Sequence, residues 1–227
     1  KDIGMVYFVL SVWSGVVGFS LSLIIRLELG VGGSWLGDEN LYNMMVTSHA
    51  IFMVFFLVMP IFMGGFGNWL LPVMLGVDDM ALPRLNNLSM LLLILSMGLV
   101  GCSLILGSGS AGWTMYPPLM LSEYSPSIGV DFMILSLHVA GLSSIFGSIN
   151  ILVTCGLTCN LMGGGDRIPM MVWALGITSV LIVLTVPVLA AGLSMLIMDR
   201  YLSTCFFDPC GGGSPLLYQH LFWFFGH

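Results

Sequence analysis

A histidine inside a long apolar run is the residue of this sequence with the clearest chemical potential. His49 lies within the uncharged run 41–77, where an ionisable side chain is costly and therefore marks a candidate functional site. On a helix it shares one face with Tyr42, Val46 and Met53. An imidazole in such a position can bind a metal ion, including the iron of a haem.

The apolar run before this histidine carries a stripe of small residues. Gly15, Gly18 and Ser22 follow one another at helical spacing, and the stripe ends at Arg26. Opposite His49, this groove could accept a large flat prosthetic group, and the arginine could bond one of its polar substituents. A small-residue helix contact beside a hydrogen-bonded histidine is the simpler interpretation. Spacing alone favours the simpler interpretation, and both remain open.

Polar side chains recur within or beside the apolar runs. Such groups can hold ordered water, and a chain of water molecules can carry protons. Hydrogen bonds between helices explain any one of these residues equally well. The series begins at Asp79 in a loop and includes Asn68, Asn86, Ser143, Ser144 and Asn150.

The other histidines have weaker cases. His138 could simply bond a neighbouring helix, and His220 lies near the start of the last apolar run, where a histidine is inexpensive. His227 follows about two turns later on the same helical face. Because one histidine does not make a metal site, further ligands of His227 would have to come from other sequence.

The elements that would position these residues are membrane-spanning helices. The chain has 227 residues, of which 58% are hydrophobic and 7% charged, whereas soluble domains carry about 25% charged residues. A water-soluble fold of this length could not hide so much apolar surface. A span needs roughly 20 apolar residues. We expect an all-α polytopic membrane protein with five transmembrane helices and the start of a sixth. The neutral runs are 5–25, 41–77, 85–122, 132–165, 168–198 and 209–227.

Several boundaries follow from the breaks between these runs. We expect the second span to begin near Tyr42 and to fray around the cluster Gly64 to Asn68, and Pro187 to be a tolerated kink. The chain lacks an initiator methionine and stops within an apolar run, so we expect a piece of a longer protein. The glycine clusters do not resemble phosphate loops, and no nucleic-acid partner is expected. The expected spans are 2–26, 42 to beyond 60, 87–106, 131–161 and 169–198, with the sixth beginning after 215.

Alternating loops divide the charges between two sides. Lys1, Arg84 and Arg167 fall on one side and Arg26 and Arg200 on the other, which weakly favours the first side as cytoplasmic or matrix. The second side also carries seven acids, and this acidic face could suit a basic soluble partner or simply solubilise the loops. The acids are Glu28, Asp38, Glu39, Glu123, Asp131, Asp199 and Asp208.

Motifs spread over the whole chain resemble one family. By these segments the sequence closely resembles subunit I of the cytochrome c oxidases, within the haem–copper oxidase family and of the mitochondrial type. The resemblance covers about the N-terminal half of that subunit and implies a place in a twelve-helix bundle. The segments are KDIGMVYF, IIRLELG, TSHAIFMVFFLVMPIFMGGFGNWLLPVM, DMALPRLNN, GWTMYPPL, SLHVAGLSSIFGSIN and DPCGGGSPLLYQHLFWFFGH.

The resemblance implies a role for each matching residue. His49 matches an axial ligand of the low-spin haem a, and Arg26 matches the arginine that bonds its formyl group. His227 matches one of three histidine ligands of the copper ion CuB. Glu28 and Gly33 match a peripheral calcium or sodium site. The haem pocket is matched by Gly15, Gly18, Ser22, Tyr42, Met53 and Trp113, and the proton-uptake path by Asp79 with Asn68, Asn86, Ser143, Ser144 and Asn150.

The resemblance further implies a cytochrome-c oxidase in the mitochondrial inner membrane, one that reduces oxygen to water and pumps protons. Residues 1–227 would form a single membrane domain with an incomplete active site, since the ligand of haem a3 and the other copper ligands match no residue here. The implied partners are cytochrome c, the copper-bearing subunit II, subunit III and the rest of subunit I. A quinol oxidase and a redox-silent helical transporter are the alternatives.

Overall fold

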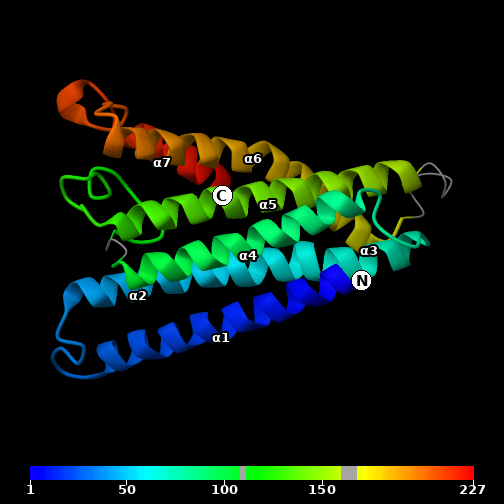
Figure 1. Cartoon of the computed structure of the whole chain (residues 1–227), viewed down its shortest axis with the longest axis horizontal. Helices are drawn as coiled ribbons and strands as arrows, with labels where there is room; N and C mark the ends of the chain where they lie inside the picture. Colours follow the sequence, from blue (N-terminus) through cyan, green and yellow to red (C-terminus); the bar gives the residue numbers. More distant parts are fainter. Residues whose placement is uncertain (108–110, 160–167) are drawn as a thin grey trace.

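The described residues form a bundle of long helices connected by loops, as Figure 1 shows. The structure is a computed structural model that describes residues 1–107, 111–159 and 168–227. Five helices in these ranges are long and apolar enough to cross a membrane, and a shorter one follows, which confirms the predicted fold class. The α-helices are α1 (Asp2–Gly30), α2 (Glu39–Ile51), α3 (Gly67–Leu75), α4 (Pro83–Ile105), α5 (Ile128–Cys159), α6 (Met170–Tyr201) and α7 (Pro215–Gly226).

Successive connections lie at opposite ends of the bundle, as the charge analysis predicts. The N-terminus and the α3–α4 loop lie at one end of the bundle, which places Lys1 and Arg84 at that same end (Figure 1). The α1–α2 and α6–α7 connections lie at the other end. Arg167 and the predicted end of the fourth span, 160–161, lie outside the described residues. Which end faces the cytoplasm or matrix stays a prediction.

The second span is one uninterrupted helix from Glu39 to Leu75, and the predicted fraying at Gly64 to Asn68 is wrong. The glycines at this point allow close packing and do not break the helix. A Cβ atom on Gly64 would lie 2.3 Å from the Tyr7 ring of α1. A Cβ atom on Gly65 would lie 2.8 Å from the Phe8 ring. Small residues at a helix contact let two backbones approach closely in a membrane.

Two π-helical segments interrupt the α pattern of this span, namely η1 (Phe52–Val58) and η2 (Pro60–Phe66). Pro60 has no N–H group to donate to an α-helical ladder, and local π geometry accommodates such a residue within a membrane helix. π segments are rare and concentrate at functional sites. Here they lie between His49 in α2 and Asn68 in α3.

Serine side chains join α4 and α5 along a seam with a seven-residue period. Ser96 and Ser136 are fully buried, and each hydroxyl donates to the other residue's carbonyl, at 2.8 and 2.9 Å. One heptad to either side, Ser143 donates to the Ser89 carbonyl and Ser103 to the Gly129 carbonyl. Small hydrogen-bonding residues at this spacing let antiparallel membrane helices pack closely. The seam therefore fixes the register of α5 against α4.

We expect Ser96→Leu to lower the thermal stability of the assembled protein far more than Ser96→Ala. Leucine would push the two backbones apart, whereas alanine keeps the close approach and loses about 0.6 kcal/mol, the average for such bonds in a membrane. Thermal inactivation of the purified complex measures both changes. Equal effects of the two variants would show that close approach at this position does not matter.

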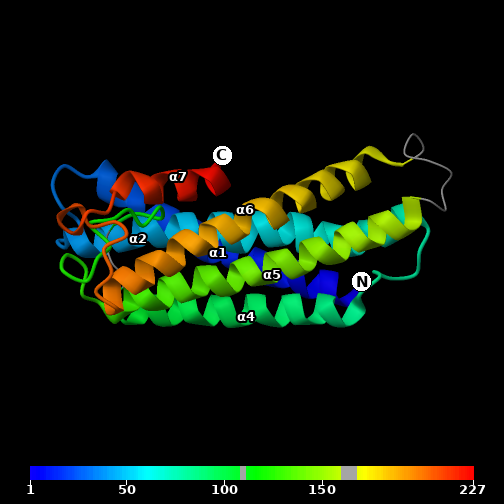
Figure 2. The same ribbon diagram turned by 90° about the horizontal axis from the view of Figure 1, so that it is seen from above.

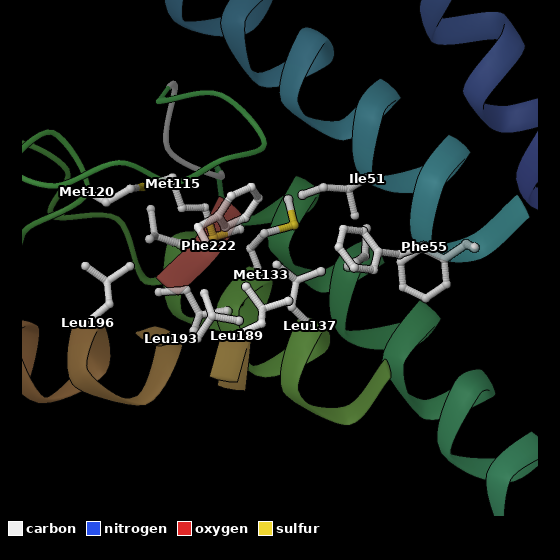
Figure 3. Close-up of a cluster of buried hydrophobic side chains, with 14 of the residues drawn as sticks. Ile51, Phe55, Met115, Met120, Met133, Leu137, Leu189, Leu193, Leu196 and Phe222 are labelled. Carbon is white, nitrogen blue, oxygen red and sulfur yellow. The ribbon is translucent and has the colours of Figure 1, made fainter. Parts of the chain in front are cut away.

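The end of the bundle that carries α7 is held by a large apolar cluster, seen in Figure 3. Phe222 of α7 meets Met115 and Met120 from the segment after α4, together with Met133 of α5 and Leu193 of α6. Figure 2 shows α5 and α6 side by side at this end and splayed apart toward the other. The cluster therefore holds α7 against α6 and the loop 111–127.

Candidate functional site

His49 is held in a defined tautomer by the neighbouring helix. Its Nδ1 atom lies 2.8 Å from the carbonyl oxygen of Gly18 in α1. A carbonyl can only accept, so the proton is on Nδ1 and the Nδ1–H group donates. The lone pair of a neutral imidazole is then on Nε2. Metal-binding histidines characteristically donate their other ring N–H to a carbonyl or carboxylate in this way, and the Nε2 lone pair of His49 could serve a metal.

The stripe on α1 packs directly against the helix that carries this histidine. A Cβ atom on Gly18 would lie 2.6 Å from the Met53 sulfur, and one on Gly15 would lie 3.2 Å from Leu57. The structure thus brings His49, Gly18, Met53 and Gly15 together, as sequence spacing predicts. Both interpretations of the stripe retain support, because a small-residue helix contact and a ligand-competent histidine occur at one place.

Toward the end of α1 the stripe becomes accessible. Ser22 is half-buried and Arg26 is exposed, and within the described ranges the guanidinium of Arg26 forms no ion pair. Tyr42 is half-buried at the start of the second span. An uncommitted arginine can bond a polar substituent of a bound group. Arg26 therefore supplies a cation, and Ser22 and Tyr42 supply hydroxyl groups, that a prosthetic group with a polar edge could bond.

Trp113 lies apart from the other residues that are expected to line the haem pocket. Its ring makes T-shaped contacts with Phe222 and Trp223 of α7, at centroid distances of 5.2 and 6.2 Å. Trp223 also donates its indole N–H to the Tyr116 hydroxyl. The loop 111–127 therefore packs onto the helix that leads to His227.

His227 follows α7, and its backbone N–H donates to the Trp223 carbonyl at 2.9 Å. Its side chain is exposed, as is that of His220. Among the described residues, no three His, Cys, Asp or Glu side chains gather to hold a metal ion. Imidazole is a suitable copper ligand, and His227 supplies one such donor.

A small cavity lies where the first five spans meet. Its volume is about 30 Å³, enough to hold water. Three predicted proton-path residues, Asn68, Ser143 and Ser144, line it together. The polar residues that sequence reasoning missed here are Tyr7, Ser89 and Ser148, of which Tyr7 had the clearest signal, a phenol within an apolar run.

The other predicted path residues lie toward the α3–α4 loop. Asp79 is exposed in this loop, and its carboxylate accepts from the Met80 N–H. Asn150 of α5 accepts from the Leu82 N–H at 2.9 Å, which ties the loop to α5. Asn86 is buried in the first turn of α4, one turn before the cavity residue Ser89. The surface carboxylate and the buried amides thus lie at the same end of the bundle.

Glu28, in the last turn of α1, and Gly33, in the α1–α2 connection, line one pocket. The Glu28 carboxylate accepts from the Trp35 and Leu36 N–H groups, at 3.1 and 2.8 Å, and from the Ser34 hydroxyl. These bonds close the loop and leave further lone pairs on the carboxylate. Oxygen donors of this kind suit calcium or sodium.

Arg200 and Asp131 form a buried ion pair at the end of the bundle opposite Asp79. From the sequence alone, both residues counted as loop charges. Arg200 and Asp131 are each 8% exposed, and Arg200 Nε lies 2.6 Å from Asp131 Oδ1. The Tyr201 hydroxyl donates to the same carboxylate. The residues are 69 positions apart, so only the folded bundle shows their pairing. Asp131 is therefore bonded inside the bundle and is not an ordinary solvated acid of the acidic face.

Comparison with known proteins gives a consistent result. Residues 2–227 match the family described as cytochrome c and quinol oxidase polypeptide I. Cytochrome c oxidase subunit 1 of Pecten maximus is 53% identical over 230 residues, which cover all of this chain and 48% of that protein. The Mytilus edulis protein of the same name is 47% identical over 229 residues, covering all of this chain and 42% of that protein. The chain thus spans about half the length of these curated relatives.

Proposed function

The chain belongs to the cytochrome c and quinol oxidase polypeptide I family, and from this premise we propose that it is part of the catalytic subunit of a proton-pumping cytochrome-c oxidase. The proposed reaction is the reduction of oxygen to water with electrons from cytochrome c. Residues 1–227 are proposed to form one membrane domain of that subunit. The match to two relatives named cytochrome c oxidase subunit 1 favours cytochrome c over a quinol as the electron donor.

The single observation that carries the proposal is the bond from His49 to the Gly18 carbonyl. It fixes the imidazole in the tautomer that can bind haem iron through Nε2. A haem with two imidazole ligands has no open position and supplies one-electron transfer. His49 would hold and orient this haem a, Arg26 would bond its edge, and the stripe with Tyr42 and Met53 would shape the pocket. Trp113, which packs on Phe222 and Trp223 of α7, would contact the haem from that side and not from the α1 stripe.

The remaining site residues have separate proposed roles. His227 would supply one imidazole to CuB, with its other ligands and that of haem a3 outside these residues. Glu28 and Gly33 would hold a calcium or sodium ion near the outer surface. Asp79 would gather protons at the surface. Asn68, Asn86, Asn150 and the adjacent serines Ser143 and Ser144 would hold the water that carries protons inward.

The proposal also covers the location and the partners of the protein. A chain with five apolar spans is a multi-pass membrane protein. We place it in the mitochondrial inner membrane with subunit II, subunit III and the rest of subunit I. An optical spectrum of the purified complex tests the proposal, since reduced haem a absorbance and turnover with cytochrome c are expected. A complex without haem absorbance would instead favour a redox-silent transporter, and turnover with quinol alone would favour a quinol oxidase.

Asp79→Asn is expected to slow proton uptake by about tenfold or more while both haems stay in place, because the amide cannot take up and release a proton at the surface. Stopped-flow measurement of proton uptake by the intact complex gives the rate. Asp78→Asn is the matched control, since it removes the same charge from the adjacent exposed position. Normal turnover and pumping in Asp79→Asn, or equal losses in both variants, would contradict the assignment.

A further inference from the structure

Ser148 is a buried serine whose hydroxyl is not used by the protein. The residue is 1% exposed, and its Oγ atom has no hydrogen-bond partner among the described residues. Buried serines in membrane helices usually donate to their own helix four residues back. Ser144 donates to the Ala140 carbonyl in this way, at 3.0 Å, and Ser179 donates to the Leu175 carbonyl at 2.7 Å. Ser148 departs from this pattern.

The same side chain lines the cavity between the first five spans. The other hydroxyl donors of the cavity are already committed. Ser89 donates to the Asn86 carbonyl at 2.8 Å, so the Tyr7 hydroxyl, 2.9 Å away, must donate to Ser89. Ser143 donates to the Ser89 carbonyl, and the Asn68 amide donates to the Gly64 carbonyl. These groups offer acceptor lone pairs to the cavity, and Ser148 offers the one uncommitted hydroxyl donor in the set.

We propose that Ser148 binds water in this cavity and positions it as part of the proton path, an inference that rests on the proposed function. A water molecule that accepts from Ser148 has two protons to donate. The oxygens of Ser143, Ser144 and Asn68, residues that line the same cavity, can accept them. The cavity volume of about 30 Å³ admits water, and a buried water typically makes about three hydrogen bonds. Ser148 is therefore a positioning residue that acts through the water it holds.

The test compares three variants in the intact oxidase complex. Ser148→Ala removes the hydroxyl, Ser148→Thr keeps it, and Ser179→Ala is the matched control, a buried serine of α6 that does not line the cavity. A high-resolution structure of the complex should show ordered water within about 3.2 Å of Ser148 Oγ. The alanine variant should lack this water. Proton uptake should slow about two- to tenfold in Ser148→Ala, the factor that one hydrogen bond is worth. Uptake should be retained in Ser148→Thr and Ser179→Ala.

The outcomes separate this inference from the proposed function. A dry site at Ser148, or normal uptake in Ser148→Ala while Asp79→Asn is slow, would overturn the role of Ser148 alone. Loss of the water together with slowed uptake, at an unchanged haem spectrum, would support it. A complex without haem absorbance would overturn the proposed function, whatever the water structure shows.

Discussion

His49→Leu is expected to eliminate the low-spin haem from the assembled oxidase. Leucine has a similar size but no nitrogen, so it could not supply the ligand that His49 would give to the haem iron. Removing only the outer partner of a metal ligand costs roughly 10–100-fold in affinity, and removing the ligand itself costs more. The helix should survive, because the Gly18 carbonyl that His49 contacts lies within the continuous α1 helix. The reduced-minus-oxidised optical spectrum of the purified complex measures the result.

His138 offers a matched control within the same bundle. It is also a half-buried histidine of a membrane helix, and its Nδ1–H donates to the Ile134 carbonyl at 3.0 Å. Its Nε2 atom, unlike that of His49, already contacts the Ser194 hydroxyl of α6 at 3.0 Å. His138→Leu should therefore keep the haem spectrum and lose only a helix contact. An unchanged haem a spectrum in His49→Leu would refute the ligand assignment.

The contrast between these two histidines shows what the sequence could and could not predict. Long apolar runs specify membrane helices because no other fold satisfies so many backbone groups in lipid, and those helices were predicted correctly. The spacing also placed Gly18 and Met53 near His49. It could not show which ring nitrogen is free, because that depends on the Gly18 carbonyl of another helix.

Local reasoning failed where a distant residue decides the outcome. Gly64 and Gly65 were expected to fray a helix, since glycine weakens helices in isolation. The rings of Tyr7 and Phe8 fill the space that larger side chains would need, so the glycines permit packing. The cavity is similar, since five helices must assemble before its lining groups meet. Ser148 carried no signal in the sequence beyond its apolar neighbours.

Charge counting could not show the internal roles of the acids at the acidic face. Several of its acids serve as internal acceptors that shape the loops. Asp199 accepts from the Phe206 and Phe207 N–H groups, and Asp38 caps α2 by accepting from the Asn40 N–H. Electrostatic attraction of a basic partner to this face stays a prediction. Their positions are nevertheless explained by loop structure alone.

The buried ion pair at this face leads to the second prediction of large effect. The Arg200 guanidinium donates to both carboxylate oxygens of Asp131. It also donates to the carbonyls of Met120, Ser125 and Ser127, at 2.5, 2.9 and 3.2 Å. One side chain therefore ties α5 and α6 to the loop 111–127. Only the planar fork of arginine can reach so many acceptors, so lysine would not replace it.

Arg200→Met is expected to destabilise the assembled protein by about 3–5 kcal/mol, because it leaves the Asp131 carboxylate buried without its partner. Thermal inactivation of the purified complex, measured as a rate, gives the loss. Arg84→Met is the control, since Arg84 is exposed and forms no ion pair within the described ranges. Its effect should stay within about 0.5 kcal/mol, as for most surface changes.

A double variant distinguishes the charge penalty from the tie to the loop. Asp131→Leu with Arg200→Met removes both charges and should recover part of the stability, since an apolar pair can replace a buried ion pair. The three loop carbonyls still lack their donor, so the loop 111–127 should remain open to proteolysis. Because Trp113 of this loop packs on α7, opening of the loop should also weaken the support of α7. Full recovery of both properties would show that Arg200 only neutralises Asp131 and does not position the helix that leads to His227.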